Sequence, residues 1–93
     1  MIRSSVDLPV STNKTQEAAQ AVSISTVKAG QEVVLVRVDG GGLGHRLAEM
    51  GLVPGSVLRI MAKGRPGPII VALGTSRMVL GRGMVHRIWV RPR

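Results

Sequence analysis

The sequence predicts an all-β fold, a small barrel of about five short strands with one short helix and one short helical turn. The length of 93 residues is enough for one small domain. Short runs rich in β-branched residues recur along the chain, and turns that contain Gly or Pro separate them. One stretch, 43–51, has apolar residues at helical spacing. Many short strands around one brief helix favour a barrel over a two-sheet sandwich.

The two parts of the chain differ in composition and charge. Residues 1–22 are rich in Ser, Thr, Gln and Asn without an apolar period, so we expect a disordered tail before a folded domain at 23–93. The tail is neutral, so the net charge of +8 lies on the domain. This field favours an acidic protein surface, nucleic acid or an anionic membrane face, unless it serves solubility alone. From residue 75 onward there is no acidic residue, and the arginines are Arg77, Arg82, Arg87, Arg91 and Arg93.

The first half of the domain is expected to hold a helical turn and a strand. The turn is predicted at 25–30, with a hydroxyl cap at its start and a glycine after its end. The strand is predicted at 31–38. Its residues Val34, Val36 and Val38 fall on one face and Arg37 on the other, which is the pattern of a half-buried strand.

The helix is predicted from Leu43, Leu47 and Met50, which are spaced i, i+4, i+7 and share one face. Gly51 stands where a helix needs a left-handed terminator, and Leu52 is placed to pack back on the last turn. We therefore expect this helix to end at Gly51 with its three apolar residues toward the core.

Short strands are expected over the rest of the chain. The strand at 56–63 places Leu58, Ile60 and Ala62 opposite Arg59 and Lys63. The other expected elements are a turn at 64–68, a hairpin of Ile69–Leu73 and Ser76–Leu80 across Gly74 and Thr75, a helical link at 82–87 and a last strand at 88–90.

Composition excludes several classes of function. The chain has no cysteine, so disulfides, thiolate metal sites and cysteine nucleophiles are excluded. Its longest apolar run is Ile69–Leu73, far short of the roughly 20 residues that a membrane helix needs. No apolar segment follows Arg3 as in a signal peptide. We therefore expect a cytoplasmic protein that contacts a membrane only indirectly.

Residues 40–55, GGGLGHRLAEMGLVPG, resemble the FeoA family, and weaker similarities extend the resemblance over about residues 22–91. These are 22–31, 67–69 and 87–90. The chain departs from the family pattern at Gly44 and His45, where a second arginine is common, and at Gly81 and Gly83. The residues that match the central motif are Gly40, Gly41, Arg46, Leu47, Met50, Gly51, Leu52, Pro54 and Gly55.

The resemblance implies an SH3-like barrel and a role beside FeoB, the membrane permease with a cytoplasmic G domain. A similar barrel forms the last domain of the iron-dependent repressors of the DtxR type, but this chain lacks the helix-turn-helix and metal-binding domain of those proteins.

No cofactor, metal or catalytic site is expected. The segment 39–45 lacks the lysine and hydroxyl of a phosphate-binding loop, so its glycines are interpreted as a tight strand-to-helix connection with positive φ. His45 and His86 stand apart in the sequence. Asp39, His45 and Glu49 would have to converge to hold a metal, and an exposed i, i+4 pair of His45 and Glu49 is favoured instead. No nucleophile motif is present, so we expect no enzyme.

Partner binding is the expected activity, and the segment 43–54 is its first candidate surface. Arg46 and Glu49 are predicted to face outward, with Leu47 and Met50 toward the core, and the alternative is that the helix only plugs the barrel. Trp89 is predicted to point outward between inward Ile88 and Val90, where it would anchor a partner. The full set of candidate partner-binding residues is Arg46, Glu49, Trp89, Arg77, Arg82 and Arg87.

The predicted function is a non-enzymatic accessory of bacterial ferrous iron uptake that binds the FeoB-type permease and changes its assembly or activity. The alternative is a basic SH3-like module that binds nucleic acid, which the charge supports and the single aromatic residue opposes. Recognition of proline-rich peptides is excluded because it needs an aromatic-lined groove. Self-association stays open.

Overall fold

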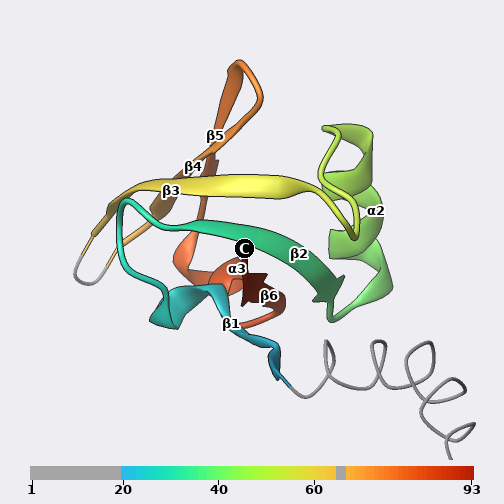
Figure 1. Ribbon diagram of the computed structural model, residues 1–93. Helices are drawn as coiled ribbons and strands as arrows, with labels where there is room; N and C mark the ends of the chain where they lie inside the picture. Colours follow the sequence, from blue (N-terminus) through green and yellow to red (C-terminus); the bar gives the residue numbers. More distant parts are fainter. Residues whose placement is uncertain (1–19, 65–66) are drawn as a thin grey trace, which may run out of the picture.

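The computed structural model describes residues 20–64 and 67–93. In this part of the chain six antiparallel strands form one sheet in the order β1-β6-β2-β3-β4-β5 (Figure 1). The predicted all-β class is therefore confirmed, with one strand more than expected. The strands are β1 Val22–Ser23, β2 Glu32–Val38, β3 Val57–Lys63, β4 Ile69–Leu73, β5 Ser76–Leu80 and β6 Ile88–Pro92, and the helices are the 3₁₀ helix η1 Ile24–Thr26, α2 Gly41–Glu49 and α3 Arg82–Val85.

Two predicted segments fall wholly or partly outside the described residues. Most of the predicted tail, 1–19, is outside, whereas Val22 pairs with Val90 in β1. The predicted turn at 64–68 is described only at its ends.

Between the helices and the sheet lies a core of aliphatic side chains, and none of the buried side chains that the structure describes is polar. The core consists of Ile24, Val27, Val33, Leu35, Leu43, Leu47, Leu52, Leu58, Ile60, Ile69, Val71, Leu80, Val85, Ile88 and Val90.

A bulge in β2 changes which side chains enter the core. Val33 and Leu35 are buried in the core cluster, whereas Val34 is buried outside it. The prediction that Val34, Val36 and Val38 share one face is therefore wrong for Val34. The pairing with β6 shifts between Leu35 and Arg37, which leaves Val36 without a partner. One extra residue moves every later side chain to the other face, so Val38 packs against the core as predicted.

A second bulge has the same effect in β3. Leu58 and Ile60 are fully buried as predicted, but the register shifts between Ile60 and Ala62. Ala62 is therefore exposed, and Lys63, predicted to face outward, is half-buried opposite core residue Ile69. The Lys63 ammonium donates to the carbonyl oxygens of Ser25 and Val27 at 2.7 and 2.8 Å, so it ties β3 to the turn after η1.

The first helical turn lies earlier than predicted. It spans Ile24–Thr26 rather than 25–30, because the Ser23 hydroxyl caps it by accepting a hydrogen bond from the Ser25 N–H at 3.2 Å. Gly30, at φ 93°, belongs to the following turn into β2. The helical link before the last strand is confirmed as α3, and β6 continues past the predicted end at Val90 to Pro92.

Helix α2 ends where it was predicted to end, but one of its apolar residues, Met50, does not face the core as predicted. Gly51 has φ 91°, and the N–H groups of Gly51 and Leu52 donate to the carbonyls of Ala48 and Leu47 at 2.9 Å. This is the Schellman arrangement, and it buries Leu52. Met50, predicted to be in the core, is 55% exposed because it occupies the cap position, past the regular turns of the helix.

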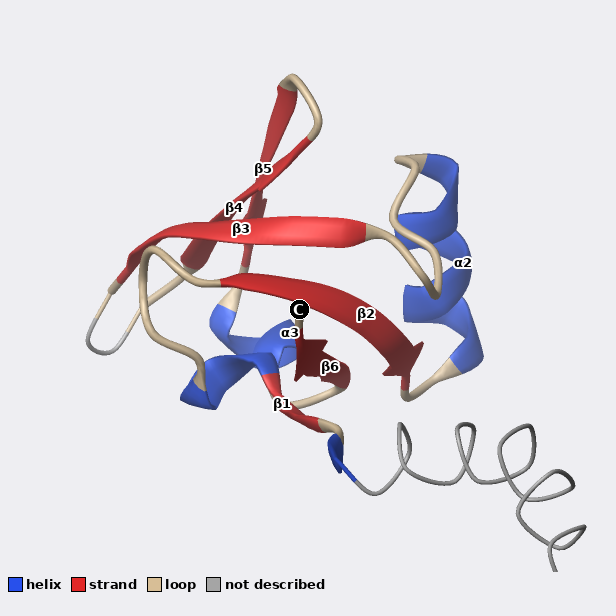
Figure 2. Cartoon of the chain, viewed as in Figure 1, coloured by secondary structure: helices blue, strands red, loops and turns tan. Residues whose placement is uncertain are grey.

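The hairpin predicted at residues 69–80 is confirmed with its register. Five consecutive pairs run from Ile69 opposite Leu80 to Leu73 opposite Ser76, and Gly74 has φ 61°. A two-residue loop with positive φ only at its first residue is the type II′ turn, which suits the twist of paired strands. The tip of this hairpin projects from the body of the molecule, while α2 stands at one end of β2 and β3 (Figure 2).

Candidate functional site

Asp39, at the end of β2, is the centre of a polar cluster on the outer side of the sheet. Its carboxylate accepts a hydrogen bond from the Trp89 indole N–H at 2.8 Å, and the Arg37 guanidinium lies 3.3 Å from its other oxygen. The same guanidinium lies over the Trp89 ring at 4.8 Å from the centroid, a cation–π contact. Ile88 and Val90 are fully buried and Trp89 is half-buried on the opposite face, so its outward direction is confirmed.

Arg87 completes this cluster from the other side. Its Nε donates to the Asp39 carbonyl at 3.0 Å, and the Asp39 N–H donates to the Arg87 carbonyl at 2.7 Å. Gly40 follows with φ 93°, and a Cβ there would overlap the Arg87 guanidinium. The glycine therefore serves the strand-to-helix connection, as interpreted from the sequence.

A shallow apolar groove lies between α2 and α3. Leu43 and Leu47 form its floor, Met50 and Met84 form its sides, and Arg46 and Glu49 stand at its rim. It encloses about 340 Å³. We call it the α2 groove. It combines a cation, a carboxylate and exposed methionine within one surface, which suits adaptable contact with a protein.

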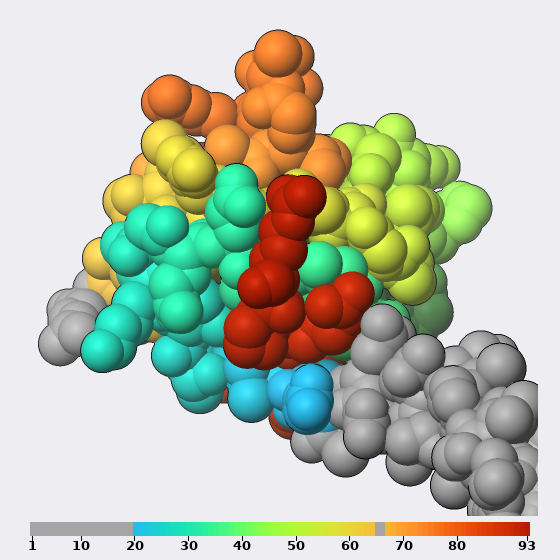
Figure 3. Space-filling view, viewed as in Figure 1, coloured from blue at the N-terminus to red at the C-terminus, as the bar shows by residue number. Residues whose placement is uncertain are grey.

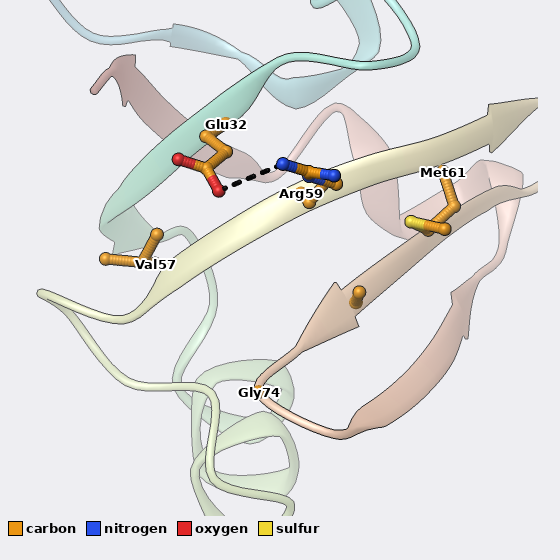
Figure 4. A pocket seen from close by; sticks show the side chains of 6 residues that line it. Glu32, Val57, Arg59, Met61 and Gly74 are labelled. Atoms are coloured by element: carbon orange, nitrogen blue, oxygen red, sulfur yellow. Dashed lines mark ion pairs between the residues drawn. The ribbon is translucent and has the colours of Figure 1, made fainter.

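A second hollow, absent from the sequence interpretation, lies on the outer face of β3 and β4 (Figure 4). Val57, Arg59 and Met61 line it from β3, and Ala72 lines it from β4. Glu32 meets Arg59 there at 3.5 Å. The alternation of Val57, Arg59 and Met61 with buried Leu58 and Ile60 was the signal for this outward row in the sequence. We call this hollow, of about 470 Å³, the outer-sheet hollow.

The six candidate partner-binding residues lie in several places rather than one. Arg46 and Glu49 both line the α2 groove, and Arg87 and Trp89 both donate hydrogen bonds to Asp39. Arg77 is exposed on β5. Arg82 lines a third hollow together with Lys63 and His86.

The described residues give no support to a metal site at the end of β2. His45 and Glu49 form an exposed i, i+4 pair at 3.3 Å, which is the arrangement favoured from the sequence. Asp39 does not join them, and no group of three potential ligands occurs in residues 20–64 and 67–93. In the same ranges no helix has the length and apolar character needed to cross a membrane.

The curved antiparallel sheet, closed by one short helix around an aliphatic core, defines a small SH3-like domain. Residues 22–92 match the FeoA domain family, and the chain belongs to this family. It is 34% identical over 68 residues to a protein of Methanocaldococcus jannaschii that bears the provisional name Fe(2+) transport protein A. The aligned region covers 72% of this chain and 82% of that protein.

Solved structures agree with this assignment. A crystal structure of an iron uptake regulatory protein, FeoA, is 29% identical with a TM-score of 0.69 and covers 78% of this chain and 97% of that one. FeoA of Stenotrophomonas maltophilia, described as a prokaryotic SH3 domain protein and solved with zinc, is 27% identical with a TM-score of 0.63, covering 74% and 88%. The family and fold inferred from the sequence are therefore confirmed.

Proposed function

We propose that this protein is a non-enzymatic cytoplasmic accessory of ferrous iron uptake that acts by binding an FeoB-type permease. Membership of the FeoA family supports the link to iron uptake, since the M. jannaschii relative is named for Fe(2+) transport. The α2 groove supports binding as the mode of action. Arg46, Leu47 and Met50 of the groove are among the residues that carry the family resemblance, and Arg46 and Met50 are exposed there.

The exposure of Met50 is the observation that carries the proposal. The Schellman cap holds this side chain outside the core, 55% exposed, beside the apolar floor of Leu43 and Leu47. Exposing a large apolar side chain contributes nothing to folding, because the hydrophobic gain comes only when water is excluded. A permease surface that covers Met50 would supply that gain on binding.

Arg46 adds specificity to this surface. Among the described residues it has no ion-pair or hydrogen-bond partner, whereas Glu49 is already engaged by His45. A free guanidinium beside an apolar floor suits bidentate recognition of a carboxylate on the permease. Binding changes the permease only if the protein prefers one of its states, so the groove must fit one permease conformation better than another.

A binding role also suits the chain better than catalysis. Catalytic acids and bases are usually groups whose pKa is shifted by burial or by strong neighbouring charges. The part of the chain that the structure describes buries no polar or charged side chain. Its polar clusters, at Asp39 and at His45, lie in solvent.

A two-arm titration at low and high salt tests the proposal. One arm uses the full permease in detergent and its isolated cytoplasmic domain, and the other uses random duplex DNA and single-stranded RNA. We expect saturable permease binding that tolerates salt, weakened about tenfold by Arg46→Glu and unchanged by the matched reversal Lys28→Glu, which lies in an exposed turn away from the groove. Tight nucleic-acid binding with a steep salt dependence, and no permease binding, would overturn the proposal and favour the nucleic-acid module.

A further inference from the structure

Strand β5 has one side free. Within residues 20–64 and 67–93 its only strand partner is β4. In a hairpin with a two-residue loop the closing pair, here Leu73 and Ser76, exchanges both hydrogen bonds, and bonded and non-bonded pairs then alternate. Arg77 and Val79 are therefore in non-bonded pairs, and their N–H and C=O groups point away from β4 toward the free edge.

The side chains at this edge are accessible together with its backbone. Val79 is 61% exposed, the most of any large apolar side chain that the structure describes, and Arg77 is also exposed. Met78 lies between these two residues and Leu80 follows Val79, and both side chains pack toward the core. The tip of the β4–β5 hairpin stands out from the body of the molecule (Figure 3).

The charged residues from β4 to the end of the chain are all basic. No acidic residue occurs from residue 67 to the end of the chain. Across the strands, Arg77 is opposite Ala72, and Ala72 is opposite Arg59, so the small alanine separates two arginines beside the outer-sheet hollow. Arg59 already meets Glu32 at 3.5 Å, whereas Arg77 has no acidic partner among the described residues.

We propose that the free edge of β5 binds an extended acidic segment of a protein partner as an additional antiparallel strand. Backbone hydrogen bonds to Arg77 and Val79 would give affinity, as in other cases of strand addition. Directly opposite residues of paired strands share a face, so a carboxylate opposite Arg77 would lie beside its guanidinium, and an apolar residue opposite Val79 would cover it. The edge therefore selects an acidic residue and an apolar residue that lie two positions apart in the partner strand, because residues i and i+2 of a strand share a face.

A second copy of the chain fits this edge less well. Pairing two β5 strands would join two molecules of net charge +8 and place both copies of Arg77 on one face of the shared ladder. Like charges at that spacing oppose association. The inference is also independent of the proposed permease contact, because it uses none of the residues of the α2 groove.

The test is amide hydrogen exchange of the full-length protein, followed by NMR, with and without a short synthetic peptide in which valine and glutamate alternate at every second position, with threonine between them. In the free protein we expect the Arg77 and Val79 amides to exchange fast and the Met78 and Leu80 amides slowly. The peptide should slow exchange at Arg77 and Val79 by about tenfold or more. The same peptide with its edge-facing amides N-methylated keeps its charge but loses these bonds, and it should give no protection.

Two substitutions complete the test. Val79→Pro removes a backbone donor at the free edge without removing a bond to β4, so the fold should survive and peptide affinity should fall about tenfold, while Val79→Thr should bind as the parent does. Arg77→Glu should reduce affinity for the acidic peptide and raise it for the same peptide with lysine in place of glutamate. Equal binding by Val79→Pro and Val79→Thr, protection at α2 instead of β5, or dimerisation that protects Arg77 and Val79 without peptide would overturn the inference.

Discussion

The Trp89 indole N–H donates to the Asp39 carboxylate at 2.8 Å, which joins the last strand to the loop that leads into α2. The two residues are far apart in the sequence, and the contact fixes the position of the loop from which the helix starts. Arg37 and Arg87 bind the same aspartate, one through the carboxylate and one through the backbone. Asp39 is therefore the residue that aligns α2 with the sheet.

Asp39→Ala should lower the free energy of unfolding by about 1 kcal/mol, because it removes a hydrogen bond and an ion pair that are partly exposed to solvent. Urea unfolding followed by Trp89 emission measures this, since Trp89 is the only tryptophan and loses its hydrogen bond in the variant. Glu49→Ala, which removes only an exposed pair with His45, is the control and should change stability by less than about 0.5 kcal/mol. Equal effects of the two substitutions would contradict the role given to Asp39.

Gly40→Ala should be destabilising by about 1–3 kcal/mol, because it places a side chain at φ 93° and against the Arg87 guanidinium. Thermal unfolding of the variant measures the loss. Gly42→Ala is the matched control, since its Cβ would meet nothing within 4 Å in α2, and it should stabilise by up to about 1 kcal/mol.

The double variant Gly40→Ala with Arg87→Ala separates the two causes of the Gly40 effect. Removing the guanidinium relieves the overlap but leaves the backbone conformation, so only part of the loss should be recovered. Full recovery would mean that the positive φ costs nothing at this position.

Lys63→Met should destabilise the protein by about 1–2 kcal/mol, because the carbonyls of Ser25 and Val27 lose their shared donor while the apolar stem is kept. The loss should be local to η1, so hydrogen exchange of the Val27 amide, bonded to the Ile24 carbonyl, should become faster. Arg59→Met on the outer face is the control. If both variants unfold at the same urea concentration, the Lys63 contacts contribute nothing.

Met50→Gln should weaken permease binding several-fold and leave stability within about 0.5 kcal/mol of the parent, because the side chain is 55% exposed. Calorimetric titration and urea unfolding of the same preparation check the two halves of this prediction. Met61→Gln, also a partly exposed methionine but in the outer-sheet hollow, should bind as the parent does. A stability loss of Met50→Gln equal to that of a core variant would instead place Met50 in the core.

Local patterns in the chain were enough to predict most of the elements. The hairpin with its Gly74–Thr75 loop, the helix with its Gly51 terminator and the inward Ile88 and Val90 all follow from turn chemistry and periodicity, which depend on neighbouring residues. The motif at 40–55 also led to the family. The partner role of the arginines and of Trp89 stays a prediction.

The errors in strand facing have a common physical origin in long-range pairing. The bulges at Val36 and Met61 arise where two strands must stay in register around a curved sheet; the first puts Val34 and Val38 on different faces, and the second turns Lys63 inward. The Asp39 cluster and the free edge of β5 likewise depend on which distant segments become neighbours. Periodicity and turn residues thus determined the elements and the family. The packing of remote strands determined which side chains meet and which edge remains open, because those contacts join residues that no local pattern relates.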